Sequence, residues 1–454
     1  MRRRRLFGGL AALLVAVAGV VAVTAQPAQA AAGFTVSGSR ILDANGNAFV
    51  MRGVNHAHTW YADKLGSLAD IKALGANTVR VVLSSGDRWT RNDAADVTNV
   101  ITQCKANRLI CVLEVHDTTG YGEESAATTL ARAVDYWIAI RSALAGQERY
   151  VILNIGNEPY GNTGTAGWVA DTKNAITRLR AAGFEHSIMV DAPNWGQDWS
   201  FTMRDNAASV FATDPQRNTI FSIHMYGVFD TAAEIDDYLG RFITAGLPIV
   251  VGEFGHNHSD GNPDEDTILA TAQSRGIGYL GWSWSGNGGG VEYLDLVTNF
   301  NASALTSWGQ RLFNGANGIK ATSREASVFG GTQPTTPTSP PTSPSVPPSS
   351  PPPTGRQCTA TYAVTGSWGG GFQGAVTVTA GGAAITSWTV TWTWPSGQRF
   401  TNTWNAAVTS SGSAVTARNM SYNGSVPAGG STSWGFTASW TGTNTAPTPT
   451  CAAA

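Results

Sequence analysis

Two glutamates in this chain each follow a short apolar run of the kind found in buried β-strands. Glu158 comes soon after the apolar residues 150–153, and Glu253 comes just after residues 249–251. A glutamate at the end of a buried strand costs free energy unless its charge has a partner or a task. Cleavage of a glycosidic bond uses two carboxyl groups, one to protonate the leaving oxygen and one to act at the sugar carbon. The pair therefore predicts a two-carboxylate active site.

The elements that must position this pair alternate between strand and helix. Apolar runs predict strands at residues 48–54, 78–83, 109–115, 150–155, 187–190, 219–224, 249–252 and 278–282. Helical patterns lie between them, as at residues 67–74, 94–106, 128–143 and 168–181. Eight such units in about 300 residues favour an α/β fold, a (β/α)8 TIM barrel over residues 31–330. An open doubly wound sheet is the alternative, but it would usually carry a glycine-rich phosphate turn after its first strand, where Gly53-Val54-Asn55-His56 stands here. A hairpin turning at Asn45-Gly46 is expected to close the barrel floor.

In such a barrel the active site lies at the carboxyl ends of the strands. Besides Glu158 and Glu253, the predicted strand ends supply a set of candidate substrate-binding residues: Arg80, His116, Asn157, Trp195, His224, Tyr226, Trp282 and Trp284. Some of them have a purely structural alternative. The glutamates and Arg80 could form a structural ion pair, the histidines could be core residues, and Trp195 and Trp284 could be packing residues.

Four motifs in chain order resemble glycoside hydrolase family 5, over residues 33–320. They are Asn157-Glu158-Pro159, His224-Met225-Tyr226, Gly252-Glu253-Phe254 and Trp282-Ser283-Trp284. The wider sequence, including the stretches at 52–56 and 112–117, looks most like the bacterial β-1,4-mannanases of that family.

The resemblance implies a role for each residue. Glu158 would be the general acid/base and Glu253 the nucleophile of a retaining mechanism. Arg80 and Tyr226 would hold Glu253, and His224 would tune Glu158. Asn157 would bind the sugar 2-hydroxyl, with Trp282 stacked under the same sugar and His116 beside it.

The N-terminus carries a predicted signal peptide, residues 1–30. Four arginines precede an apolar stretch at residues 6–23, and Ala28-Gln29-Ala30 fits a cleavage site. A membrane-spanning helix is the alternative, and whether export follows the general or the twin-arginine route stays open. We expect a secreted, extracellular protein.

Charge excludes some partners. The chain has 29 basic and 31 acidic side chains, and loss of residues 1–30 would leave 25 and 31. This negative balance argues against nucleic acid or an anionic membrane surface as a partner. In a secreted chain, the four cysteines predict two disulfides, Cys104–Cys111 and Cys358–Cys451, with free thiols as the alternative for the first pair.

A linker at residues 331–354 holds ten of the twenty prolines and precedes a block of different composition. Residues 355–454 contain no Asp, Glu, Lys or His but seven tryptophans, so this block is expected to bind rather than catalyse. Its period-2 patterns predict an all-β antiparallel sandwich. The motifs SWGGGF at 367, TWNA at 403 and YNG at 422 are similar to family 2 carbohydrate-binding modules. That resemblance implies a binding strip of Trp368, Trp404 and Tyr422 facing cellulose, with chitin or mannan as other ligands.

Three consecutive acidic residues, Asp264, Glu265 and Asp266, could bind calcium. The alternative is an acidic helix start, where the helix dipole favours carboxylates. No cofactor is otherwise expected.

Together these observations predict a monomeric, secreted endo-β-1,4-mannanase that acts on plant cell-wall mannan, galactomannan and glucomannan and carries a cellulose-targeting module. The preference for mannan rests on the resemblance alone. An endo-β-1,4-glucanase on the same scaffold, or a non-hydrolytic polysaccharide-binding protein, are the alternatives.

Overall fold

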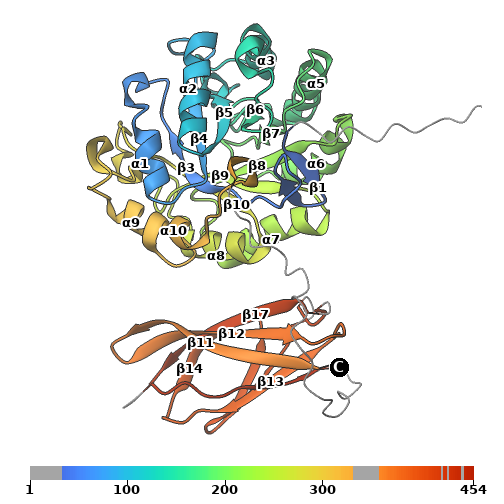
Figure 1. Cartoon of the computed structure of the whole chain (residues 1–454), viewed down its shortest axis with the longest axis vertical. Helices are drawn as coiled ribbons and strands as arrows, with labels where there is room; N and C mark the ends of the chain where they lie inside the picture. The colour runs from blue at the N-terminus through green and yellow to red at the C-terminus, as the bar shows by residue number, and fades with distance from the viewer. Residues whose placement is uncertain (1–32, 331–356, 421–422, 427–428, 441–443, 454) are drawn as a thin grey trace, which may run out of the picture. The chain divides into compact units, whose positions relative to one another are not determined.

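The chain divides into two compact units, with the division between Ser339 and Pro340. The computed structural model describes residues 33–330, 357–420, 423–426, 429–440 and 444–453 (Figure 1). The predicted signal peptide and linker lie outside the described residues. Within those residues, every helix is too short or too polar to span a bilayer.

The first unit is a closed barrel of eight parallel strands, which confirms the predicted fold class. Around the barrel the order is β10-β3-β4-β5-β6-β7-β8-β9. The strands are β3 (Arg52–His56), β4 (Thr78–Leu83), β5 (Ile110–Val115), β6 (Val151–Asn154), β7 (Ile188–Asp191), β8 (Thr219–Met225), β9 (Ile249–Phe254) and β10 (Gly278–Gly281). All eight predicted strands are present, most within two residues at each end.

Helices form a ring around the strands (Figure 1). They are α1 (Ser67–Ala73), α2 (Ala94–Ala106), α3 (Leu130–Ala139), α4 (Arg141–Leu144), α5 (Trp168–Ala181), α6 (Thr202–Thr213), α7 (Ala232–Thr244), α8 (Glu265–Arg275), α9 (Ser307–Asn314) and α10 (Ile319–Thr322). Several begin at a side-chain cap of the expected type. Asp93 accepts hydrogen bonds from two backbone amides of α2, and Thr231 accepts one from α7. The single helix predicted at residues 128–143 is two helices, α3 and α4.

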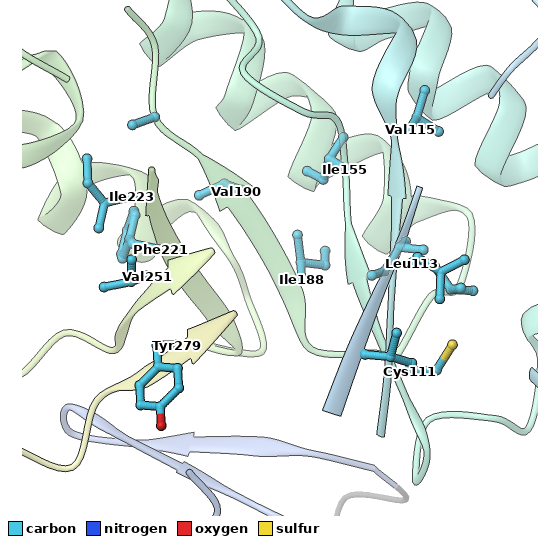
Figure 2. Packing of buried hydrophobic residues seen from close by; sticks show 14 of the residues in the cluster. Cys111, Leu113, Val115, Ile155, Ile188, Val190, Phe221, Ile223, Val251 and Tyr279 are labelled. Carbon is cyan, nitrogen blue, oxygen red and sulfur yellow. The ribbon is translucent and has the colours of Figure 1, made fainter. Parts of the chain in front are cut away.

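Side chains on each strand alternate between the barrel interior and the surrounding helices. On β5, Cys111, Leu113 and Val115 belong to the large cluster that includes the helix residues, whereas Ile110 and Val112 belong to the separate interior cluster. Figure 2 shows the outward set on several strands. This period of two points the polar strand-end residues inward, above the apolar interior floor.

One irregularity in the barrel changes the direction of a catalytic candidate. Between β8 and β9 the register shifts, so that Ile223 pairs with Val251 but His224 pairs with Glu253. Gly252 is the extra residue of this β-bulge, and it moves Glu253 onto the interior face. A Cβ at Gly252 would lie 2.2 Å from Ser222 Oγ, so glycine leaves the space that the bulge needs.

The N-terminal hairpin differs in its turn. β1 (Thr35–Ser37) and β2 (Arg40–Leu42) pair across Gly38, whose φ is +60°, rather than across Asn45-Gly46. Asn45-Gly46 forms a second turn, after which Ala48 bridges back to Leu42. The predicted floor hairpin is thus one turn earlier than expected.

The second unit consists of two four-stranded antiparallel sheets, as predicted. One has the order β11-β12-β17-β14 and the other β15-β16-β13-β18. The strands are β11 (Cys358–Trp368), β12 (Gly371–Ala380), β13 (Trp388–Thr393), β14 (Arg399–Trp404), β15 (Ala407–Ser411), β16 (Ala414–Arg418), β17 (Ser431–Ser439) and β18 (Thr450–Ala453). The core between them is aromatic and includes Trp388, Trp392, Trp394 and Trp434.

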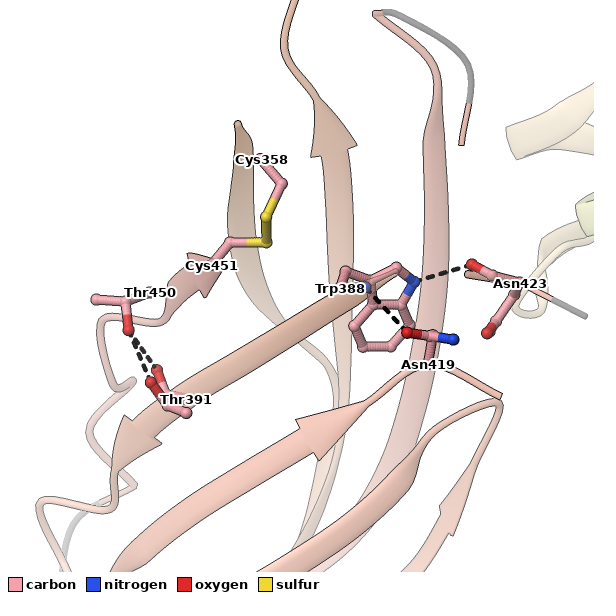
Figure 3. Close-up of a disulfide and its surroundings, with 7 residues drawn as sticks. All are labelled: Cys358, Trp388, Thr391, Asn419, Asn423, Thr450 and Cys451. Carbon is pink, nitrogen blue, oxygen red and sulfur yellow. Dashed lines mark hydrogen bonds between the residues drawn. A yellow bond between two sulfur atoms is a disulfide. The ribbon is translucent and has the colours of Figure 1, made fainter. Parts of the chain in front are cut away.

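A disulfide and local hydrogen bonds hold this second unit together (Figure 3). Cys358 is bonded to Cys451, 93 residues away, which confirms that predicted pair. Trp388 donates from its backbone amide to Asn419 Oδ1 and from Nε1 to the Asn423 carbonyl, both at 2.9 Å.

The predicted disulfide between Cys104 and Cys111 is absent from the structure. Both residues are free thiols, one on α2 and one on β5, with their Sγ atoms 2.8 Å apart. Both are fully buried in the apolar layer between helix and strand, where a thiol packs as a small hydrophobic side chain. The alternative interpretation, buried free thiols, is the one that the structure supports.

Candidate active site

The two glutamates meet at the carboxyl end of the barrel. Glu158 follows β6 and Glu253 lies in β9, and both are buried, with 8% and 3% of their surface exposed. Their carboxylate oxygens and a ring nitrogen of His224 all lie within 4.8 Å of one another. Glu158 has a φ of +38°, in the left-handed region that disfavours residues with a Cβ. Backbone strain of this kind is typical of functional sites.

Arg80 connects the residues of this site from the centre of the barrel. Its side chain is fully buried and donates to Glu253 Oε1 at 2.7 Å and to Asp191 Oδ2 at 3.0 Å. It also donates to three amide oxygens, those of Asn55, Asn154 and Asn157. Burial disfavours the guanidinium, but the surrounding carboxylates outweigh it and raise the pKa of Arg80. Arg80 is thus a permanent cation beside the carboxylate of Glu253, the nucleophile candidate.

Glu253 accepts a second hydrogen bond, from Tyr226 Oη to Oε2 at 3.0 Å. Burial raises the pKa of Glu253, while the nearby His224 and Arg80 cations oppose the rise. Burial and the Glu253 carboxylate also raise the pKa of Tyr226. Tyr226 therefore remains a neutral hydrogen-bond donor, as predicted.

His224 contacts both catalytic candidates. Its Nδ1 is 2.8 Å from Glu158 Oε1 and 3.5 Å from Glu253 Oε2. Burial disfavours the imidazolium, but Glu253 and Asp191 outweigh this and raise the pKa of His224 to about 10. A protonated imidazole donates from both ring nitrogens, here towards the glutamates through Nδ1 and towards Asp191 through Nε2.

Asp191, at the end of β7, is a residue of the inner site that the sequence analysis did not select. It is 3.4 Å from His224 Nε2 through Oδ2, which also accepts from Arg80. Burial alone would raise the pKa of Asp191, but Arg80 and His224 outweigh it and lower the pKa to about 2. Its position at a strand end was the available signal, but nothing in the sequence showed its two cationic partners.

Asn157 and His116 complete the inner site. Asn157 Oδ1 is occupied by Arg80, and its Nδ2 donates to Thr119 Oγ1 at 2.9 Å, which fixes the amide orientation. His116 Nδ1 lies 2.9 Å from Glu114 Oε1. Burial lowers the pKa of His116, but Glu114 and then Glu253 outweigh it, so the pKa is raised.

An aromatic group surrounds His116 at the mouth of the barrel. Trp282 stacks on the imidazole with ring centroids 5.6 Å apart. Trp60 and Trp89 contact the same imidazole edge-on or tilted, at 5.2 and 5.6 Å. Trp60 remains 38% exposed. The predicted sugar contacts His116 and Trp282 are thus adjacent, and Trp60 and Trp89 extend the same surface.

The two remaining tryptophans of the predicted site, Trp195 and Trp284, differ in how far they are buried. Trp195, half-buried, follows β7 at the rim of the barrel, where Nε1 donates to Glu123 Oε2 at 2.9 Å. Trp284 is fully buried, belongs to the apolar core and contacts Phe313 edge-on. A substrate-binding role for Trp284 is therefore wrong. It lies two residues beyond Trp282 along the chain, and its ring packs between strand and helix.

The predicted calcium ligands do not converge. Asp264 is the N-cap of α8 and accepts from the Thr267 amide at 2.9 Å. Asp266 Oδ1 accepts from Arg311 at 2.5 Å. Burial raises the pKa of Glu265. Among the described residues, these three are not gathered as a ligand set. The geometry favours an acidic helix start.

The predicted binding strip of the second unit is only partly described. Trp404, at the end of β14, is 36% exposed, and its ring lies over Gly435, where a Cβ would come within 2.5 Å of it. Trp368 ends β11. Tyr422 lies outside the described residues.

The geometry of the first unit can support acid/base and nucleophilic chemistry at a sugar, since two buried carboxylates face one another beside fixed donors. Residues 42–288 match the family model described as cellulase (glycosyl hydrolase family 5), and residues 358–453 match the cellulose binding domain. The chain belongs to glycosyl hydrolase family 5.

Similar proteins in this family are mannanases by name. A mannan endo-1,4-beta-mannosidase of Streptomyces lividans is 66% identical over 320 residues, which is 70% of this chain and 83% of that protein. One of Cellvibrio japonicus is 54% identical over 333 residues, 73% of this chain and 75% of its own. A solved β-mannanase from Thermomonospora fusca, in complex with mannotriose, is 60% identical with a TM-score of 0.64, and covers 66% of this chain and 99% of its own.

Proposed function

We propose that this protein is a secreted endo-β-1,4-mannanase that hydrolyses internal bonds of mannan, galactomannan and glucomannan with retention of configuration. The separation of the two carboxylates is the observation that supports retention of configuration. Retaining enzymes hold their carboxyl groups about 5–5.5 Å apart, whereas inverting enzymes need about 6.5–9.5 Å to admit a water. Here carboxylate oxygens of Glu158 and Glu253 lie within 4.8 Å. The names of the similar proteins support mannan as the substrate.

In the first step Glu253 attacks the anomeric carbon and forms an ester with the sugar. The glycosidic carbon–oxygen bond breaks, and the carboxyl proton of Glu158 passes to the leaving oxygen. Arg80 and Tyr226 hold Glu253 with one hydrogen bond to each oxygen. This orientation fixes the attacking lone pair before substrate arrives.

In the second step a water attacks the same carbon and breaks the ester to Glu253. Glu158, now a carboxylate, accepts the proton of that water and is ready for the next turnover. The His224 cation between the glutamates stabilises whichever of the two is ionised. The chemistry uses protein carboxyl groups alone, so we infer that no cofactor is required and that activity persists in a chelator.

The substrate assignment is tested by incubating the purified protein with galactomannan, glucomannan and carboxymethyl-cellulose and measuring new reducing ends. Release from the two mannans is expected. Release from carboxymethyl-cellulose alone would instead identify an endoglucanase. An absence of release from all three would favour a non-hydrolytic binding protein.

The mechanism is tested by Glu253→Ala with added azide. The variant should lose hydrolysis, and azide in the vacated space should form the α-glycosyl azide from an activated aryl β-mannoside. A β-azide product, or full activity without azide, would contradict the assignment of Glu253 as nucleophile.

We further propose that residues 1–30 direct export and that the C-terminal unit anchors the enzyme on cellulose. We also propose that the active protein is a monomer. Deletion of residues 355–454 should reduce retention on insoluble cellulose while turnover of soluble mannan is kept. Equal retention with and without the deleted unit would contradict the anchoring role.

A further inference from the structure

Two separate aromatic groups lie at the carboxyl end of the barrel. The first, around His116, comes from the loops after β10, β3, β4 and β5, which are neighbours in the barrel. The second comes from the loop after β7 and contains Trp195 and Trp199. Trp199 is 50% exposed, the highest value among the exposed large apolar side chains of the described residues.

Trp199 is exposed but held in place. Its Nε1 donates to Asn162 Oδ1 at 2.7 Å, and Asn162 lies in the loop after β6. The backbone amide of Asn162 donates to Glu123 Oε1 at 2.7 Å, and the other oxygen of Glu123 accepts from Trp195 Nε1 at 2.9 Å. One carboxylate thus connects the anchors of both indoles. Since the polar edge of Trp199 is already paired, the exposed remainder of the side chain is apolar ring.

The position of this group relative to the catalytic pair decides which sugar it can meet. Because Glu158 protonates the leaving oxygen, we place the departing sugar units on the Glu158 side of the site. Glu158 follows β6, and the loops after β6 and β7 supply Asn162 and Trp199. The His116 group lies on the other side, around the strands β10 to β5.

We propose that Trp199 forms a binding subsite for a mannose unit on the leaving-group side, with its exposed ring stacked on the C–H face of the sugar. Asn162 and Glu123 are positioning residues that hold the ring. The proposal rests on the mannanase function proposed above and deepens it. An apolar ring held rigid binds a sugar face at a low entropic cost.

A leaving-group subsite also binds acceptors. In the second catalytic step a sugar hydroxyl can replace water: its oxygen bonds to the anomeric carbon, its proton passes to Glu158, and the ester to Glu253 breaks. A sugar stacked on Trp199 is held for this transfer. Trp199 therefore raises the yield of longer oligosaccharides as well as the cleavage of long substrates.

The test compares two substrates in the full-length protein. Mannohexaose extends into leaving-group subsites, whereas an aryl β-mannobioside places only its aryl group beyond the cleaved bond. For Trp199→Ala, the ratio of kcat/KM for mannohexaose to that for the aryl mannobioside should fall roughly five- to tenfold. Transfer products from mannotetraose should fall with it. Trp199→Phe keeps a ring and should recover most of the ratio, and Ile138→Ala removes a similarly exposed apolar side chain on α3 and should not change it.

Two results would overturn the proposal. One is an unchanged ratio and an unchanged transfer yield in Trp199→Ala. The other is an equal fall on both substrates, which would show that Trp199 does not act on a mannose unit in a leaving-group subsite. A wild-type protein without activity on either mannan substrate would instead refute the proposed function itself, so the two failures can be told apart.

Discussion

Removal of the Arg80 cation should destabilise the barrel and displace the pH profile together. Arg80→Met keeps the length of the side chain but removes one of the two cations that the buried carboxylates of Glu253 and Asp191 share, since His224 stays near both. It also leaves three amide oxygens without a donor. Breaking a buried ion pair by removing one partner costs about 3–5 kcal/mol. In a domain of this size each kcal/mol corresponds to roughly 2–3 °C, so Tm should fall by roughly 6–15 °C.

The direction of the kinetic change follows from the same contacts. Arg80 opposes the rise that burial causes in the pKa of Glu253. Without Arg80 that pKa rises further, so a smaller fraction of Glu253 is ionised at a given acidic pH. The acid limb of kcat/KM, which reports the free enzyme, should therefore move to higher pH, in addition to a fall in its maximum.

Thermal scans and pH profiles on soluble mannan measure both effects. Arg178→Met is the matched control, because Arg178 pairs with Asp135 at the surface and its loss should change Tm by less than about 2 °C. Arg80→Lys keeps the charge but cannot reach all five acceptors, so its Tm and its acid limb should lie between those of wild type and Arg80→Met. If Arg80→Met has a Tm within about 2 °C of wild type and an acid limb of kcat/KM at the wild-type pH, the view that Arg80 holds the site together is refuted.

Three other predictions test separate features. In Gly252→Ala the added Cβ should push against Ser222 Oγ and shift Glu253 from its attacking position, and a displacement near 1 Å should lower kcat on the order of 10²-fold. Gly66→Ala is the control and should keep the wild-type kcat, because a Cβ there would meet nothing within 4 Å. Because His224 has a folded pKa of about 10, raised from 6.5, its stabilising contribution is complete below pH 6.5 and is lost as the pH rises towards 10; Tm should fall over this range in wild type and less steeply in His224→Gln. Cys358→Ser opens a cross-link between residues 93 apart and should lower the free energy of unfolding of the C-terminal unit by about 2–5 kcal/mol. Calorimetry on the full-length protein should show the unfolding transition of this unit at a lower temperature, and an unchanged scan would contradict a stabilising role for the disulfide.

The sequence was informative where the physical signal is local. Buried parallel strands require continuous apolar runs, and helices require a cap and an apolar period, so the strands and helices could be predicted close to their observed bounds. His116, His224 and Tyr226 could be predicted for the site because strand ends of a barrel share one face. Arg80 was predicted on the same ground, but it lies in the third position of β4 and reaches the site through the length of its side chain.

The errors arose where the outcome depends on a side-chain direction or on a partner elsewhere in the chain. Trp284 is near Trp282 in sequence, but its ring packs into the apolar core. The bulge at Gly252, which turns Glu253 inward, depends on pairing with β8 and has no signal in β9 alone. The state of Cys104 depends on how α2 packs against β5, which spacing along the chain does not determine.

The division of labour between the two glutamates is also a matter of partners. Glu253 accepts from Arg80 and Tyr226, one donor for each oxygen, and such donors favour the ionised form that a nucleophile needs. Glu158 accepts through Oε1 from His224, and in the described part of the chain its other oxygen has no hydrogen-bond donor. That oxygen is free to carry the proton and deliver it to the leaving group. Both residues follow similar apolar runs, so their own sequence context does not separate them. The opposite roles come from Arg80 and Tyr226, which reach Glu253 and not Glu158.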